Sequence, residues 1–127
     1  MIGITVIKSG PWFDGRAAHA IEQALDESAR RTAQLGATVI RAEQARTYRK
    51  ETPYDRLQNV AERNPPGWKI WDRNGVYGPW LEGIGSRNFP RTRFRGYAIY
   101  RRNLQLIDRR AGVIAEYTFK EFEGAMN

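Results

Sequence analysis

Cysteine is absent from all 127 residues of this chain. The sequence therefore has no disulfide framework, no thiolate nucleophile and no cysteine-based zinc site, a composition that suits a reducing compartment. Its apolar runs all fall short of the roughly 20 residues that a membrane-spanning helix needs. The N-terminus also lacks the basic, apolar and small-residue order of a signal peptide. We therefore expect a soluble intracellular protein that has no membrane partner.

Residues suited to catalysis are also scarce. His19 is the only histidine, and no serine carries the nucleophile-elbow motif that would mark it as a partner. Asp26 and Glu27 diverge as neighbours on a helix, as do Glu121 and Glu123, so neither pair suits acid–base chemistry. No metal-ligand spacing emerges, and residues 83–85 lack the third glycine and the Lys-Ser/Thr ending of a phosphate loop. The sequence predicts a protein that is not an enzyme and holds no cofactor or metal.

Size and composition fit one domain that spans residues 1–127. Hydrophobic residues make up 41% of the chain and charged residues 28%, both near the averages of globular proteins. The aromatic content of 12% argues against disorder. A chain of this length can bury one core but not two, so we expect a single folded unit.

Two long helices are the clearest structural signals. Small or apolar residues recur every three or four positions from Ala17 to Ala42, which predicts an amphipathic helix over residues 15–46. Gly36 weakens the middle of this helix and predicts either a break or a close contact there. A second helix is predicted over residues 97–122, with an apolar face that consists of Tyr97, Tyr100, Leu104, Ile107, Ala111, Ile114 and Phe122.

Strand signals surround a hairpin pattern. Short strands are predicted over residues 2–7, 54–61 and 68–72, with a turn at residues 64–67. Arg73-Asn74-Gly75 predicts a tight turn into a returning strand over residues 76–81, and Pro79 predicts that this strand lies at a sheet edge or bends there. Residues 83–96 have no helical or strand period and predict a long loop. The expected fold class is α+β, a small antiparallel sheet packed by a long N-terminal helix and a C-terminal helix.

Positive charge is concentrated in one segment. Between Arg87 and Arg110 there are eight arginines and a single acid, Asp108, which gives this segment the same charge of +7 as the whole chain. Such concentration has three interpretations: a solvated surface, pairing with carboxylates of neighbouring copies, or contact with nucleic-acid phosphates. Nearby aromatics could stack on bases, yet no known base-reading motif accompanies them.

The segment from Val76 to Tyr100 resembles a known family. Its Val-Tyr-Gly-Pro-Trp-Leu-Glu-Gly, Ser86-Arg87-Asn88 and Thr-Arg-Phe-Arg-Gly-Tyr stretches are similar to those of tail-completion or tail-terminator proteins. These proteins lie at the head-to-tail neck of long-tailed bacteriophages, particularly those that infect actinobacteria. The resembling residues cover about 25 positions, and the expected order of elements matches over most of the chain.

The resemblance implies a structural ring subunit of the virion, assembled in the host cytoplasm from six copies. Such a subunit closes the tail tube and provides the face on which the DNA-filled capsid docks. Its partners would be copies of itself, the tail tube protein, other neck or connector proteins and DNA that passes through the channel. A stopper, adaptor or minor tail protein, or a basic non-specific DNA-binding module, remain as alternatives.

Two sets of residues are the candidate contact sites. For the subunit or partner interface we predict Tyr77, Trp80, Leu81, Glu82, Arg87, Arg91, Arg93 and Arg95. For contacts with DNA or with an acidic partner we predict Arg101, Arg102, Arg109 and Arg110.

Overall fold

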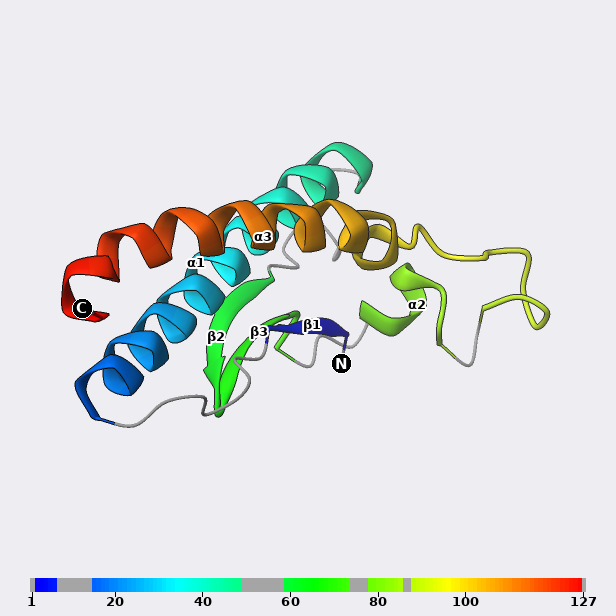
Figure 1. The fold of residues 1–127 in the computed structure, drawn as a ribbon. Helices are drawn as coiled ribbons and strands as arrows, with labels where there is room; N and C mark the ends of the chain where they lie inside the picture. Colours follow the sequence, from blue (N-terminus) through cyan, green and yellow to red (C-terminus); the bar gives the residue numbers. More distant parts are fainter. Residues whose placement is uncertain (1, 7–14, 49–58, 74–77, 86–87, 127) are drawn as a thin grey trace.

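The described part of the chain forms three strands and three helices. The computed structural model describes residues 2–6, 15–48, 59–73, 78–85 and 88–126. Along the chain the elements are β1 (Gly3–Val6), α1 (Gly15–Thr47), β2 (Val60–Asn64), β3 (Gly67–Trp71), α2 (Gly78–Glu82) and α3 (Ile99–Met126). This arrangement confirms the expected α+β class, with two long helices packed on a small antiparallel sheet (Figure 1).

The sheet has the order β1-β3-β2, and both pairings are antiparallel. The central strand β3 pairs through Trp71 with Gly3 of β1 on one side and with Val60 of β2 on the other. β2 and β3 are joined by a turn at residues 65–66, where two prolines cannot donate to a strand ladder. Alternation places Ile70 of β3 on the face that the helices cover, where it is fully buried.

The helices α1 and α3 run antiparallel on the same side of the sheet (Figure 1). α1 contacts all three strands, whereas α3 packs mainly along α1. The helices approach closely because small side chains line α1, and a Cβ carbon placed on Gly36 would lie 2.3 Å from Cδ1 of Ile70 and 3.1 Å from Cδ1 of Ile107. The close contact predicted at Gly36 is therefore confirmed, and α1 continues through it without a break.

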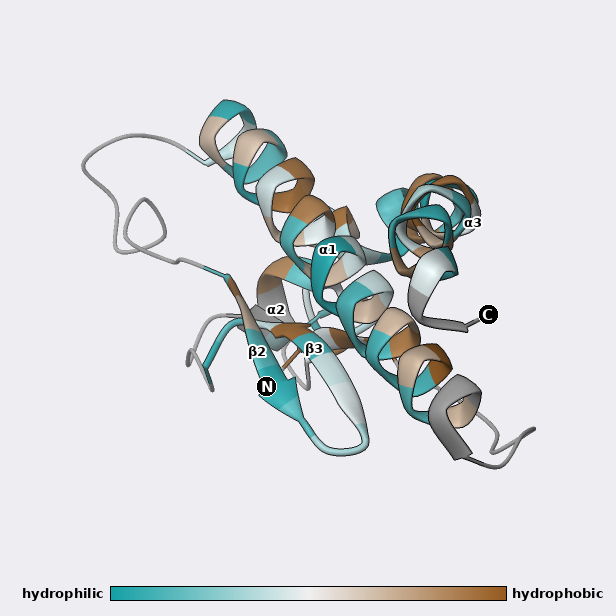
Figure 2. Ribbon diagram, turned by 60° about the vertical axis from the view of Figure 1, so that its left-hand side comes forward, coloured by the Kyte–Doolittle hydropathy of each residue, from teal (hydrophilic) through white to brown (hydrophobic). Residues whose placement is uncertain are grey.

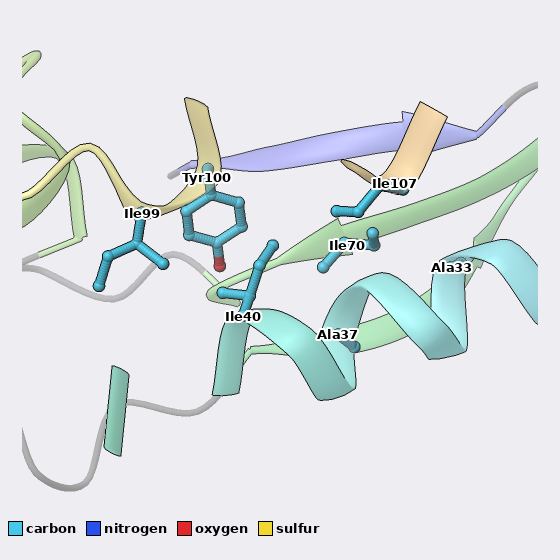
Figure 3. Close-up of a cluster of buried hydrophobic side chains, with 7 residues drawn as sticks. All are labelled: Ala33, Ala37, Ile40, Ile70, Ile99, Tyr100 and Ile107. Atoms are coloured by element: carbon cyan, nitrogen blue, oxygen red, sulfur yellow. The ribbon is translucent and has the colours of Figure 1, made fainter. Parts of the chain in front are cut away.

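The core lies where α1, β3 and the first half of α3 meet. Figure 3 shows isoleucines from all three elements pointing toward one another across the small side chains of α1. Burying each isoleucine contributes about 1.5–3 kcal/mol relative to its exposure in water. The cluster consists of Ala33, Ala37, Ile40, Ile70, Ile99, Tyr100 and Ile107.

Several predicted boundaries agree closely with the structure. The helix predicted over residues 15–46 is observed at Gly15–Thr47, and the strands predicted at residues 2–7 and 68–72 are observed at Gly3–Val6 and Gly67–Trp71. The last helix begins at Ile99, two residues later than predicted, because Gly96 and Ala98 have positive φ angles that no α-helix accommodates. Of its predicted apolar face, Tyr100 and Ile107 are buried, whereas Leu104 is exposed.

Two predicted strands need correction. β2 occupies Val60–Asn64, so the strand predicted at residues 54–61 ends three residues too early and wrongly includes Asn59. Residues 54–58 lie outside the described residues. The returning strand predicted over residues 76–81 is wrong at its described positions, because Gly78–Glu82 form the helix α2. Pro79 lies in the first turn of α2, where its missing N–H would have no partner within the helix anyway. Of the turn predicted at residues 73–75, Arg73 is described and has a positive φ angle of 54°. The rest of that turn and the start of the returning strand lie outside the described residues.

Candidate interaction surface

The predicted loop over residues 83–96, called here the arginine loop, projects from one end of the molecule (Figure 1). Its two ends meet at Gly83 and Gly96, which have φ angles of 103° and 88°. A Cβ carbon on Gly83 would lie 2.2 Å from the carbonyl oxygen of Arg95. Just beyond the loop, the backbone N–H of Tyr97 donates to the carbonyl oxygen of Leu81 at 2.6 Å. The base of the loop is therefore closed by direct backbone contact, as in an Ω-loop.

Asn88 organises the interior of the arginine loop. Its buried side-chain oxygen accepts a hydrogen bond from the backbone N–H of Gly85 at 2.7 Å, and its side-chain NH₂ donates to the carbonyl oxygen of Phe94 at 3.3 Å. The backbone N–H of Phe89 donates to the same carbonyl at 2.9 Å. The prediction missed this role, although an asparagine within a glycine-rich loop is the usual signal for side-chain bonding to backbone groups.

Aromatic rings lie on both sides of the arginine loop: some pack against the helices, and one is exposed to solvent. The Tyr97 ring packs edge-on against Phe94, with centroids 5.2 Å apart, and against Tyr48 at the end of α1. On the outer side, the guanidinium of Arg95 lies 3.8 Å from the centroid of the Phe89 ring, which is 53% exposed. The loop thus offers an exposed aromatic ring whose neighbour is a cation.

Two of the predicted interface residues do not lie at the surface. Leu81 is 2% exposed and belongs to the interior. Glu82 is also buried, and its two carboxylate oxygens accept hydrogen bonds from the backbone N–H groups of Tyr100 and Arg101, each at 3.0 Å. Because Ala98, directly before α3, has no side-chain acceptor, Glu82 takes the place of an N-cap residue. Leu81 and Glu82 are therefore enclosed within the chain, whereas the sequence analysis expected both at a contact surface.

The predicted arginines are mostly exposed and unpaired. Arg91, Arg93 and Arg95 lie on the loop, and Arg101 and Arg102 follow at the start of α3. Arg102 pairs with Glu43 of α1 at 2.7 Å. The other described arginines of the segment form no ion pair with any carboxylate in the described part of the chain, namely Arg91, Arg93, Arg95, Arg101, Arg109 and Arg110.

The structure brings these arginines together only in part. The loop arginines and the first pair on α3 lie at one end of the molecule (Figure 1). Arg109 and Arg110 lie about 12 Å further along α3, at 1.5 Å per residue from Arg101 and Arg102. Tyr77 and Arg87, and the side chain of Trp80, lie outside the part of the chain that the structure describes.

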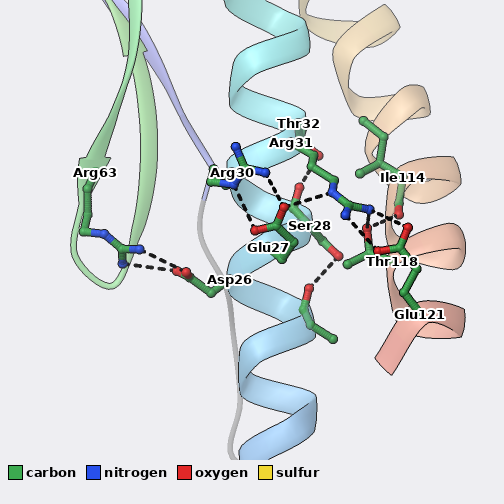
Figure 4. A network of polar contacts seen from close by, with 11 residues as sticks. Asp26, Glu27, Ser28, Arg30, Arg31, Thr32, Arg63, Ile114, Thr118 and Glu121 are labelled. Carbon is green, nitrogen blue, oxygen red and sulfur yellow. Dashed lines mark hydrogen bonds and ion pairs between the residues drawn. The ribbon is translucent and has the colours of Figure 1, made fainter. Parts of the chain in front are cut away.

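Ion pairs elsewhere are used to hold the fold together. In Figure 4 the guanidinium of Arg31 bridges the long helices, with Nη2 2.8 Å from Glu121 of α3 and Nε 3.0 Å from Glu27 of α1. Arg63 of β2 reaches Asp26 of α1 at 3.0 Å. Hydrogen bonds from Arg30 and then from Arg31 hold the pKa of Glu27 below its usual range, and Arg31 does the same for Glu121. These arginines have internal partners, in contrast to those of the arginine loop.

Tyr48 and Tyr100 are partly or fully buried phenols that lie near the carboxyl groups of Asp72 and Glu82. Burial raises the pKa of Tyr48 to about 12, and it raises the pKa of Tyr100 still further. Both phenols therefore remain neutral near pH 7 and act as packing residues. His19 is exposed on α1. Within the described ranges, no three His, Asp or Glu side chains are grouped as they would be around a metal ion.

Within the described residues, none of the helices combines the length and apolar character that a bilayer crossing needs. No protein-family model, curated protein or solved structure matches this chain. The surface itself is therefore the basis for a functional proposal.

Proposed function

We propose that this chain is a structural ring subunit at the head-to-tail junction of a long-tailed bacteriophage, where it closes the tail tube and presents a docking face for the DNA-filled capsid. The resemblance of residues 76–100 to tail-completion and tail-terminator proteins motivates the proposal. The observation that carries it is a loop with a closed base, whose exposed arginines form no ion pair with a described carboxylate. Such a surface serves contacts outside the chain.

The geometry of the arginine loop supports a role in assembly. The loop is closed at Gly83 and Gly96 and pinned inside by Asn88, so the backbone that presents its arginines is held in a fixed arrangement. A fixed arrangement lowers the entropy cost of binding, and guanidinium groups form bidentate pairs with carboxylates. The exposed Phe89 adds an apolar contact of the kind found near the centre of protein interfaces.

The mass of the purified protein tests this proposal. At micromolar concentration, native mass spectrometry and sedimentation should show a closed oligomer, for which we expect six copies. Electron microscopy of particles from a phage that lacks the protein should show heads and tails that fail to join. A chain that stays monomeric at all concentrations, with normal particles in its absence, would contradict a ring subunit.

The same arginines favour a second candidate, a basic non-specific DNA-binding module. If about six of them contact phosphates, the affinity for DNA should fall about a thousandfold between 50 and 200 mM salt. A monomer that binds DNA with this salt dependence would favour the DNA-binding module over the neck subunit. Closed oligomers without DNA affinity would exclude the DNA-binding module. A stopper, adaptor or minor tail protein would differ in its place on the particle, which labelled particles would reveal.

A further inference from the structure

The molecule has two chemically different ends. Because Arg31 contacts Glu121 and Arg102 contacts Glu43, α1 and α3 are antiparallel, and the C-terminal end of α3 lies beside the N-terminal half of α1. The arginine loop lies at the opposite end (Figure 1). At 1.5 Å per residue, the stretch of α3 between Arg102 and Glu121 separates the ends by about 28 Å.

The charges at the two ends are opposite in sign. From residue 88 to residue 102 the chain has five arginines and no acid. After Ile114, α3 has three acids against one base, Lys120. Glu121 forms an ion pair with Arg31. Glu116 and Glu123 are exposed and form no ion pair with a described cation. Each end therefore has charges that are free to pair with the other end of a second molecule.

Both ends also expose apolar surface. On the loop side, Ile84 and Phe89 are more than half exposed. On the side of α3, Tyr117 is 65% exposed and Val113 is 47% exposed. Next to them is a groove of about 450 Å³ between α1 and α3, and the hydropathy colours in Figure 2 show apolar residues along both helices. Six apolar residues and one cation line it: Leu35, Val39, Leu106, Ile107, Val113, Ile114 and Arg110.

Helical spacing places the free acids beside this apolar surface. Val113, Glu116, Tyr117 and Lys120 are three or four residues apart, so they share one face of α3, and Glu123 follows at the same spacing. We call these five residues the acidic face of α3. It combines an exposed ring with carboxylates, whereas the arginine loop combines an exposed ring with guanidinium groups.

We propose that the acidic face of α3 receives the arginine loop of a second copy of this chain. Arg91 and Arg93 of one copy pair with Glu116 and Glu123 of the next, while Phe89 packs against the apolar surface beside them. The inference rests on the proposed ring function and names the interface that would build the ring. Contact between two different surfaces is heterologous, and such contacts close into a ring when the rotation allows it. The complementary charges favour a second copy over DNA, because the acidic face would repel phosphates.

Charge reversal on each side tests the interface. One variant reverses the loop, Arg91→Glu with Arg93→Glu, and the other reverses the helix, Glu116→Arg with Glu123→Arg. Each variant alone should lose assembly, with at least a tenfold rise in the concentration needed for oligomers. All four positions are exposed, so circular dichroism and the thermal midpoint should match those of the wild type. The matched control, Arg41→Glu with Arg46→Glu, makes the same charge change on exposed positions of α1 and should assemble normally.

Mixing the two variants gives the sharper result. An acidic loop from one variant fits the basic helix face of the other, and the unaltered surfaces still fit each other. A 1:1 mixture should therefore regain oligomers of the wild-type mass, with the two variants alternating. Wild-type assembly that persists in both single variants, or a mixture that stays dissociated, would overturn this interface and leave the ring function standing. A wild type that never assembles would overturn the ring function itself, and the interface with it.

Discussion

Gly96 lies so close to Gly83 that a Cβ carbon on Gly96 would be 2.2 Å from the Cα atom of Gly83. No real Cβ atom has such a contact, and the neighbouring atoms belong to backbone that cannot rotate away. Both residues also have positive φ angles, which side chains other than glycine rarely adopt. The base of the arginine loop therefore depends on two glycines that are 13 positions apart in the sequence.

Replacing Gly96 by alanine should open the loop. The strained backbone alone should lower the free energy of unfolding by about 1–3 kcal/mol, and the backbone clash adds to this cost. Urea denaturation measures the loss, and limited proteolysis should show cleavage between residues 83 and 96 at a lower protease concentration.

Gly112→Ala is the matched control for this substitution. A Cβ carbon there meets no atom within 4 Å, and the residue lies inside α3. Alanine at this position should stabilise the protein by about 0.5–1 kcal/mol. Equal effects of the two substitutions would show that the contact between Gly83 and Gly96 is not needed for the loop.

Glu82 should be the residue that secures the start of α3. Replacement by alanine leaves the buried N–H group of Tyr100 and the partly buried N–H group of Arg101 without an acceptor, which should cost about 0.5–2 kcal/mol. Hydrogen exchange should show faster exchange of these two amides. Glu116→Ala, at an exposed position of the same helix, should leave both amides protected. Unchanged protection in Glu82→Ala would mean that the cap does not hold the first turn.

Periodicity along the chain was sufficient to predict α1. Its small residues recur at helical spacing over the whole helix, and the same residues form the face that packs against the sheet and α3. The same holds for β3, whose aromatic and β-branched residues follow a glycine-proline turn. The α+β class could therefore be predicted from sequence patterns alone.

The region after β3 could not be predicted in the same way. Residues 78–82 contain both glycine and proline and have no helical or strand periodicity. Proline is common both in the first turn of a helix and in an edge strand, so only the observed place of Pro79 in the first turn of α2 distinguishes the two. The role of Glu82 depends on partners 18 and 19 residues away, which no local pattern specifies. The role of Asn88, in contrast, has a local signal in the glycine-rich loop around it. The exposure of the arginines could be expected from their predicted positions on a loop and a helix. Whether they form ion pairs within the chain depends on the tertiary structure.

The stability of the protein should fall in acid, in part through Arg31. Glu27 and Glu121 have folded-state pKa values below the ordinary value of 4.5 because hydrogen bonds from Arg30 and Arg31 favour their ionised forms. A lowered pKa stabilises the folded state when the pH is above about 4.5, and this contribution is lost as the pH falls through the folded-state values. Arg31→Met should therefore lower stability at pH 7 and flatten its decline below pH 4.5.

Urea midpoints at pH 7, 5, 4 and 3 would measure this difference. Arg41→Met, which removes an exposed arginine that has no ion pair with a described carboxylate, should keep the wild-type profile. Parallel profiles for the wild type and Arg31→Met would indicate that the bridge between α1 and α3 does not contribute to the acid sensitivity.

Substitution of the loop arginines should change the stability of the protein less than substitution of Arg102 does. Arg102 pairs with Glu43 and also donates to the carbonyl oxygen of Tyr97 at 2.9 Å, so Arg102→Ala should cost about 0.5–1 kcal/mol. Arg91→Ala and Arg93→Ala remove exposed side chains without a described ionic partner and should shift the unfolding midpoint within experimental error. Thermal unfolding of the three variants under one buffer condition makes the comparison. If Arg91→Ala destabilised the protein as much as Arg102→Ala, the loop arginines would be part of the fold, and their exposure would no longer argue for a contact outside the chain.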